Sequence, residues 1–430
     1  MTPHDPHRQR GALLIGALLS ALALGAGVAP ATAQTPTRAI EYSIWGDPAE
    51  LASQQAVVNG FMAKHPDITV HVTVSDWDTY WDKLQTGLAG GDAPDVFAMD
   101  GPLYPDYQSR GALMDLSPYI TRDNFDLTAL ADAGVADFTT PDGQFGLPRD
   151  LNVVALYYNK DMFDAAGLAY PDATWTWDTL VEAGKKLTLD TNGDGQTDQW
   201  GFYTETTDME NYWSSLVWQN GGDIVSADHT KTLLGSAQAI GGIQQLQDLI
   251  YTHKIMPPPQ VSLGLGDAFE QKQAAMEANG SWLVPTHLAA GINLGIAPLP
   301  AGPAGAATSI NPTGVVVANT TKEPDAAWEF VKYMVGPEAQ TQLMQLKSAV
   351  PVDKSVLAGP YSSAFPGSDV FASVIADAHL KPSFRGFSDW STALQEELDV
   401  NVFNDPLKTA QQAMESVVPT LDGILAQQAP

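Results

Sequence analysis

Residues 68–74 read Ile-Thr-Val-His-Val-Thr-Val, and this stretch decides the fold class. Apolar residues at positions 68, 70, 72 and 74 alternate with polar residues at positions 69, 71 and 73. A period of two places the apolar side chains on one face of an extended backbone. The stretch therefore predicts a half-buried β-strand.

The segments on either side of this strand alternate between strand and helix patterns. An alternating pattern at 40–45 precedes a helical stretch that ends before Pro66, and a second helical stretch at 80–88 follows and ends at Gly90-Gly91. A short apolar strand at 96–99 completes the order β-α-β-α-β. We therefore expect an α/β fold in which a parallel sheet carries helices on its faces.

Ligands of open parallel sheets bind beyond the carboxyl ends of the strands. The residues at these ends are Trp45-Gly46-Asp47, Ser75-Asp76-Trp77 and Asp100-Gly101. Gly101 permits close approach of a ligand to the backbone after the third strand. We expect the functional site at this edge of the sheet.

The rest of the chain carries further elements without an internal repeat. The expected segments are a strand at 153–158, a mostly helical region at 174–276, a connector rich in Gly, Pro and Ala at 295–312, a buried strand at 315–318 and a helix that begins at Pro324. Their number and the chain length of 430 residues predict more than one domain.

The composition excludes several classes of function. The chain has 50 acidic and 21 basic residues, a formal charge of −29, which argues against nucleic acid or an anionic membrane as the main partner. It has no cysteine, which excludes disulfides, cysteine-ligated zinc, cysteine nucleophiles and a lipid on an N-terminal cysteine.

The N-terminus has the order of a secretory signal. Basic residues within 7–10 precede an apolar stretch at 11–30, and Ala31-Thr32-Ala33 then offers small residues for signal peptidase. We predict a cleaved signal peptide at 1–33. An N-terminal membrane anchor is the alternative, but the stretch is Gly-rich and ends at a cleavage signal.

Nine passages resemble one family in their order and spacing. They are residues 61–70, 90–96, 110–116, 145–148, 156–163, 166–175, 274–276, 279–282 and 326–330. Together they look like the extracellular solute-binding proteins of ABC importers, specifically the sugar-binding type exemplified by maltose-binding protein. The resemblance covers nearly all of the chain after the predicted signal peptide.

This resemblance implies a two-lobe periplasmic-binding-protein fold with a ligand cleft at the hinge. The first lobe would comprise 39–148 and 312–347, and the second would comprise 149–311 and 348–430. Closure around a sugar would present the protein to the membrane subunits of an ABC importer. The resemblance implies a monomer that needs no cofactor, and the missing N-terminal cysteine implies release into a periplasm without a lipid anchor.

Sugars present flat C–H faces and rings of hydroxyls, so a sugar site needs aromatic faces and polar partners. The stacking candidates are Trp45, Trp77, Trp213, Trp282 and Trp390. The polar candidates are Asp47, Asp76, Asp100, Asp150 and Arg385. The resemblance adds Gly280, because Gly280-Ser281-Trp282 matches a loop that lines the sugar site in the family.

Each candidate also has a structural interpretation. A Trp at the end of a strand can close the core, and an Asp there can cap the next helix, as Asp76 is placed to do before Trp77. Trp175 and Trp177 flank the start of a helix and Trp328 lies on a helix face, so we expect these three to be structural.

Residues 190–198 carry a separate pattern, which indicates a loop that binds a structural calcium ion. Oxygen-bearing side chains at alternate positions resemble a calcium loop, with Gly195 at its sixth position; they are Asp190, Asn192, Asp194, Gln196 and Asp198. The twelfth position is Gly201 instead of Glu, so the bidentate ligand is missing. An acidic loop of Asx turns is the alternative.

A secreted glycoside hydrolase acting on oligosaccharides is the alternative function, because 50 acidic residues allow many carboxylate pairs. No serine elbow, His-Glu-x-x-His motif or P-loop occurs in the sequence. We therefore expect a binding protein and not an enzyme.

Overall fold

The computed structural model describes residues 38–46, 48–206, 208–209, 212–265, 267–404 and 407–428. The predicted signal peptide and Asp47 lie outside these residues. In the described part of the chain, no helix is both long enough and apolar enough to span a bilayer.

The first three strands and two helices follow the predicted order. They are β1 (Arg38–Trp45), α1 (Pro48–Lys64), β2 (Ile68–Ser75), α2 (Trp77–Gly90) and β3 (Val96–Asp100). Strand β1 lies in the middle and pairs in parallel with both β2 and β3. The predicted β-α-β-α-β unit and its parallel sheet are confirmed.

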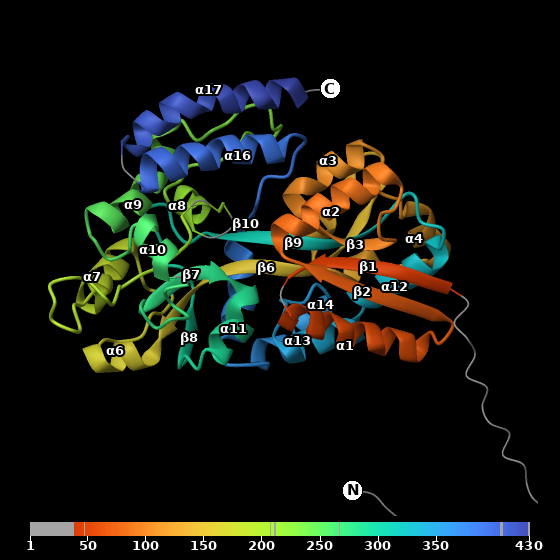
Figure 1. The fold of residues 1–430 in the computed structure, drawn as a ribbon, viewed down its shortest axis with the longest axis horizontal. Coiled ribbons are helices and arrows are strands. Elements are labelled where there is room, and N and C mark those ends of the chain that lie inside the picture. Colours follow the sequence, from red (N-terminus) through yellow and green to blue (C-terminus); the bar gives the residue numbers. More distant parts are fainter. Residues whose placement is uncertain are drawn as a thin grey trace, which may run out of the picture. The chain divides into compact units, whose positions relative to one another are not determined.

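Two long strands, β9 (Thr308–Val317) and β6 (Gly146–Asn159), extend this sheet (Figure 1). The nearer strand, β9, runs antiparallel to β3, and β6 runs antiparallel to β9 and so in the direction of β3. Strand β9 lies between β3 and β6, giving the order β2-β1-β3-β9-β6-β7. The first half of β6 pairs with β9, and its second half pairs with β7 (Met276–Gly280) and β8 (Leu294–Ala297). The complete sheet is therefore mixed, because β9 runs antiparallel to β3 and β6, and β7 and β8 run antiparallel to β6.

The predicted connector at 295–312 is wrong at both ends. Its first residues belong to β8 and residues 308–312 belong to β9, where every side chain is buried. A strand buried on both faces lacks alternation, and Pro312 disfavours a central strand in sequence. The strand nevertheless forms, and Pro312 lies opposite Leu151 in the register with β6.

Alternate residues of the sheet pack on opposite layers of helices. Val315 and Val317 join the core that contains Phe61 of α1 and Trp328 of α12 (Pro324–Val335). Val316 points the other way, toward α2 and α3 (Tyr104–Ser109). The full burial of Trp328 confirms that it is structural.

Five further helices lie in the parts of the chain that flank the central strands. They are α4 (Ser117–Asp123), α5 (Asp132–Asp137), α13 (Pro337–Leu346), α14 (Lys354–Leu357) and α15 (Ser368–Val374). Short strands β4 (Thr139–Thr140) and β5 (Gly143–Gln144) form a separate hairpin, and β10 (Ala378–Leu380) pairs in parallel with the start of β9. We call β1–β3 with α1–α5, α12 and α13 the first lobe.

The second lobe is mostly helical and has its own core. It comprises β7 and β8 with α6 (Lys160–Ala166), α7 (Trp177–Leu187), α8 (Trp213–Gln219), α9 (Ala237–Tyr251), α10 (Pro259–Leu265), α11 (Val284–Ala289), α16 (Phe387–Leu398) and α17 (Ala410–Gln428). Helices α16 and α17 lie side by side over this core (Figure 1). The helical region predicted from 174 to 276 is confirmed in α7 to α10.

Strands β6 and β9 are the connection between the two lobes. Strand β6 has a bulge between Pro148 and Asp150, where its register with β9 shifts. The buried amide of Gln340 donates to the carbonyl of Arg149 at this bulge (2.8 Å) and accepts from the backbone N–H of Val352 (2.8 Å). The predicted lobe boundaries at 148/149 and 311/312 fall in these two strands; the boundaries themselves stay predictions.

Candidate ligand-binding site

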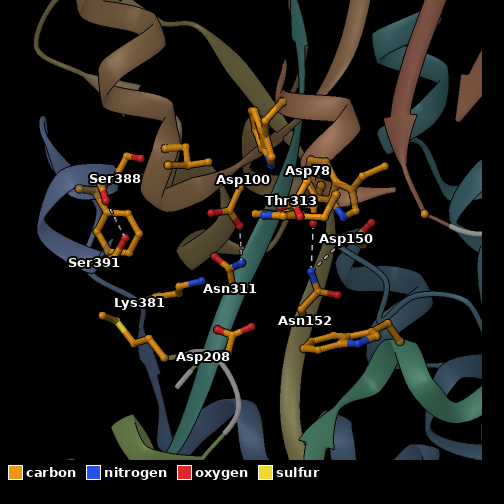
Figure 2. A pocket seen from close by; sticks show the side chains of 18 of the residues that line it. Asp78, Asp100, Asp150, Asn152, Asp208, Asn311, Thr313, Lys381, Ser388 and Ser391 are labelled. Atoms are coloured by element: carbon orange, nitrogen blue, oxygen red, sulfur yellow. Dashed lines mark hydrogen bonds between the residues drawn. The ribbon is translucent and has the colours of Figure 1, made fainter. Parts of the chain in front are cut away.

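A cleft of about 1440 Å³ lies between the lobes at the carboxyl ends of β1 and β3. The first lobe contributes the end of β1, α2, the end of β3 and α3. Strands β6 and β9 form the floor, and the second lobe contributes residues within 205–209, 279–286 and 381–395. Figure 2 shows side chains from both walls and the floor pointing into this space. The site lies at the edge of the sheet that the strand order predicted.

A cluster of three indole rings forms the wall of the first lobe. Trp45 ends β1, and its ring lies 5.1 Å from that of Trp77 and 5.6 Å from that of Trp81, between centroids. Trp77 and Trp81 meet edge to face at 5.4 Å. Trp77 is 44% exposed, so a large apolar surface faces the cleft. Such a surface suits the C–H face of a sugar ring.

Trp81 was not among the sequence candidates, although the sequence contained a signal for it. It follows Trp77 by four residues, so both side chains lie on one face of α2. Its indole N–H is buried without a hydrogen-bond partner among the described residues. Asp76, by contrast, accepts from the backbone N–H of Thr79 (3.0 Å) and caps α2, as its structural interpretation predicted.

The floor of the cleft is polar and tightly hydrogen-bonded (Figure 2). Asp100 at the end of β3 accepts from the side-chain amide of Asn311 on β9 (2.6 Å). Asn152 on β6 donates to the hydroxyl of Thr313 (2.9 Å). Burial raises the pKa of Asp100, and the positive charge of Lys381 opposes that rise. Asp100 and Asp150 were both predicted as polar partners of a ligand, and both line the cleft.

Asp150 is held by its neighbour in the sequence. The guanidinium of Arg149 donates to its carboxylate (2.6 Å), and both side chains are almost fully buried. Arg149 also reaches the hydroxyl of Tyr42 (3.4 Å), whose pKa is raised by burial against the opposing charge of Arg149. This fixed arrangement presents Asp150 at the bulge of β6, where the two lobes meet.

Trp282 is the indole on the opposite wall. It lies in a short 3-10 turn, Ser281–Leu283, directly after β7, and it is half-buried. A Cβ atom on Gly280 would lie 1.7 Å from the Trp282 ring, so only glycine leaves room for the indole there. Gly280 itself does not line the cleft but allows Trp282 to do so. Arg385 also lines this wall.

Trp213 and Trp390 are placed elsewhere, contrary to the sequence prediction. Both are fully buried in the helical core of the second lobe, and neither lines the cleft. The indole N–H of Trp390 donates to the hydroxyl of Thr232 (3.1 Å). Trp177 likewise donates to Gln219 (2.6 Å), in agreement with its structural interpretation.

The cleft is strongly acidic. Ten carboxylates line it against four basic side chains, counted over the described residues. The acids are Glu50, Asp78, Asp82, Asp100, Asp106, Asp150, Glu205, Asp208, Asp267 and Asp389. Beside the floor, burial raises the pKa of Asp137 to about 8, and the nearby charge of Asp100 adds to the rise. The field of this cleft disfavours an anionic ligand.

The loop at 190–198 lies apart from the cleft, and its acidic side chains bond to their own backbone. The carboxylate of Asp190 accepts from the N–H groups of Gly193 (2.6 Å) and Gly195 (2.8 Å), and Asp198 accepts from Thr191 (2.8 Å). Over the described residues, no group of three or more His, Cys, Asp or Glu side chains is arranged to hold a metal ion. Occupancy by calcium stays a prediction.

Two lobes joined by the long strands β6 and β9, with a cleft between them that is lined by indoles on both walls and by a polar floor, define a bilobal binding protein. The sequence pattern of the bacterial extracellular solute-binding protein family matches residues 45–341. The chain belongs to this family, whose members bind solutes and are not enzymes. They act outside the cytoplasm, so the coarser prediction of a periplasmic or extracellular protein holds.

Named relatives and a solved structure resemble this chain over most of its length. The chain is 25% identical to the arabinooligosaccharide-binding protein of Halalkalibacterium halodurans, over 90% of this chain and 93% of that protein. It is 25% identical to the lactose-binding protein of Rhizobium radiobacter, over 87% of each. Among solved structures, an ABC substrate-binding protein from Listeria monocytogenes in complex with cycloalternan matches with a TM-score of 0.84 and 27% identity, over 91% of this chain and 99% of that one.

These findings confirm the predicted fold class and the resemblance to sugar-binding proteins of ABC importers. They give no support to the alternative of a glycoside hydrolase.

Proposed function

We propose that the protein binds a sugar in the cleft and delivers it to an ABC importer. The observation that carries this proposal is the indole wall of Trp45, Trp77 and Trp81, which faces carboxylates and amides across one cleft. Indole faces cover the apolar faces of sugar rings, and carboxylates accept hydrogen bonds from hydroxyls. The three relatives described above are named for a saccharide or were solved in complex with one, which supports the same conclusion.

The ligand is a neutral oligosaccharide and not a charged monosaccharide. A cleft of about 1440 Å³ exceeds the roughly 300–1,000 Å³ of common small-molecule pockets, which leaves room for several sugar units. The excess of carboxylates in its lining opposes uronates and sugar phosphates.

Delivery requires the two lobes to close around the sugar. The two strands β6 and β9 connect the lobes, and bending there would bring Trp282 toward the indole wall of the first lobe. A ligand that contacts both walls stabilises the closed form by its differential affinity for that form. The membrane subunits of the importer would recognise this closed form.

The experiment is a thermal-shift screen followed by calorimetry. A panel of neutral mono- and oligosaccharides, an amino sugar, a uronate and a sugar phosphate is added to the purified protein, and hits are titrated. A neutral oligosaccharide should raise the melting temperature by mass action, bind at one site and be recovered unaltered. Tight binding of an anionic ligand alone, or conversion of the sugar, would overturn the proposal.

The finer localisation is part of the same proposal. The order of basic, apolar and small residues at 7–33 supports export and cleavage after Ala33, and the absence of cysteine supports a protein without a lipid anchor. The resemblance to solute-binding proteins supports a monomer. Intact-mass analysis of the exported protein tests the cleavage, because the measured mass should match that of a chain that starts at Gln34 and not that of the full sequence. Light scattering tests the monomer.

The loop at 190–198 is proposed as a weak structural calcium site. The pattern of oxygen-bearing side chains supports it, while the missing twelfth ligand argues for low affinity. The function proposed for the cleft does not depend on this ion.

A further inference from the structure

A third contact joins the lobes beside the strands of the hinge. The segment that leads from β10 into α16 belongs to the second lobe, and it lies against the end of β3 and the start of α3 in the first lobe. The hydroxyl of Ser383 donates to the carbonyl of Gly101 (2.8 Å), and the backbone N–H of Gly386 donates to the carboxylate of Asp106 (2.9 Å). Leu103 packs against the cores of both lobes.

The Asp106 bond falls at the N-cap of a long helix, α16. Gly386 is the N-cap residue of α16, with φ of 78°, and no side chain of the helix itself caps this end. A carboxylate from the other lobe therefore satisfies an N–H group at the helix start, where the helix dipole also favours negative charge. The body of α16 is anchored in the second lobe through Trp390 and Leu394.

This helix start is also part of the cleft wall. Arg385, Ser388 and Asp389 line the cleft on either side of Gly386 and are exposed. Asp106 lines the cleft as well, from the first lobe. The position of three ligand-facing side chains thus depends on a hydrogen bond that crosses between the lobes.

We propose that Asp106 is a positioning residue of the ligand site. Its carboxylate fixes the first turn of α16 against the first lobe and so holds the Arg385–Asp389 wall in the geometry that binds sugar. The expected effect of Asp106 on sugar affinity rests on the proposed function. Its expected effect on the first turn of α16 rests on the structure alone.

The test compares Asp106→Ala with Asp106→Asn in the full chain. Alanine removes the acceptor, whereas asparagine keeps an oxygen at the same position and removes the charge. Hydrogen exchange should accelerate at the amides of 386–388 in Asp106→Ala and stay near the wild-type rate in Asp106→Asn. For the sugar identified by the screen, the dissociation constant should rise about 3–10-fold in Asp106→Ala, the cost of one hydrogen bond, and less than twofold in Asp106→Asn.

Rescue by asparagine separates positioning from a general loss of stability, and thermal unfolding without ligand checks that both variants fold. Unchanged affinity in Asp106→Ala overturns the proposal, as does an equal loss in both variants. If the wild type binds no sugar, the proposed function fails. Hydrogen exchange then decides the positioning role alone: faster exchange only in Asp106→Ala supports it, and equal exchange in all three proteins refutes it.

Discussion

The indole wall of the first lobe and the helical core of the second lobe use tryptophan in opposite ways, although the sequence presents these residues alike. In the first lobe, Trp45 ends β1, Trp77 begins α2 just after β2, and both line the cleft. In the second lobe, Trp213 and Trp390 lie on helices and are fully buried. The difference teaches that the end of a parallel strand directs a side chain to the ligand edge, whereas a helix directs it to whichever layer it packs on.

The largest effect should come from a buried tryptophan. Trp390→Ala removes a fully buried indole from the helical core and should lower the free energy of unfolding by about 3–5 kcal/mol. Denaturant unfolding monitored by circular dichroism measures this loss. Trp390→Phe is the control and should lose less. A stable Trp390→Ala variant with weakened sugar binding would reverse the roles assigned to the two groups.

Trp282→Ala should affect binding more than folding. Trp282 is the indole of the second wall and is only half-buried, so its removal should raise the dissociation constant for the sugar about 10–100-fold. Calorimetry gives the affinity. Tyr170→Ala, at an exposed ring that does not line the cleft, is the matched control and should bind as the wild type does. Unchanged affinity in Trp282→Ala would remove this residue from the site.

Trp77→Ala should give a smaller loss of affinity. Trp77 is the most exposed indole of the first wall, and Trp45 and Trp81 remain behind it when it is removed. We expect a dissociation constant about 3–10-fold higher, with unfolding changed by less than about 1 kcal/mol because little buried surface is lost. A loss equal to that of Trp282→Ala would mean that the two walls contribute equally.

The acidic floor beside the first wall should give a pH-dependent stability. The pKa of Asp137 is raised by burial to about 8, so between pH 4 and 8 the folded protein keeps a proton that the unfolded chain releases. The contribution of Asp137 to the free energy of unfolding is therefore greatest at pH 4 and declines as the pH rises toward 8. Asp137→Asn should flatten that decline.

Melting temperatures measured from pH 4 to pH 9 test this prediction. Asp142→Asn, in an exposed turn, is the control and should keep the wild-type profile. A profile of Asp137→Asn parallel to that of the wild type would contradict the predicted proton.

Calcium should have the smallest effect. The carboxylate oxygens of the 190–198 loop already accept backbone hydrogen bonds, and the loop lies apart from the cleft. Added calcium should therefore raise the melting temperature of the wild type by about 1–2 °C at most and leave Asp190→Asn unchanged. Sugar affinity should be the same with calcium and with chelator. A shift of 10 °C would mean that the ion is essential to the second lobe.

The sequence predicted the β-α-β-α-β unit and the edge that carries the site, because both follow from local periodicity. It could not predict that β9 enters this sheet between β3 and β6, since that pairing joins residues more than 150 positions apart. Nor could the sequence distinguish the tryptophan of the second lobe that lines the cleft from those that are buried in its core. The family resemblance pointed to Gly280-Ser281-Trp282, and the structure places Trp282 in the cleft lining, where Gly280 leaves room for its ring.

The uncharged residues of the polar floor were missed for a related reason, although Asp100 and Asp150 were among the candidates. Asn152, Asn311 and Thr313 lie inside buried strands, where polar residues are uncommon without a partner. That mismatch between side chain and position is a signal, but it becomes visible only once β6 and β9 are known to be buried strands. Trp81 was the one missed cleft residue that helix spacing alone could have found.

The shared strands also have a consequence for how the chain acquires its structure. Because β9 fills the gap between β3 and β6, the sheet of the first lobe stays incomplete until residue 317 has been made, long after its other strands. Such non-local pairing gives a high contact order and slow folding. A chain whose native sheet closes this late stays unfolded for longer after synthesis, which suits a protein that works outside the cytoplasm.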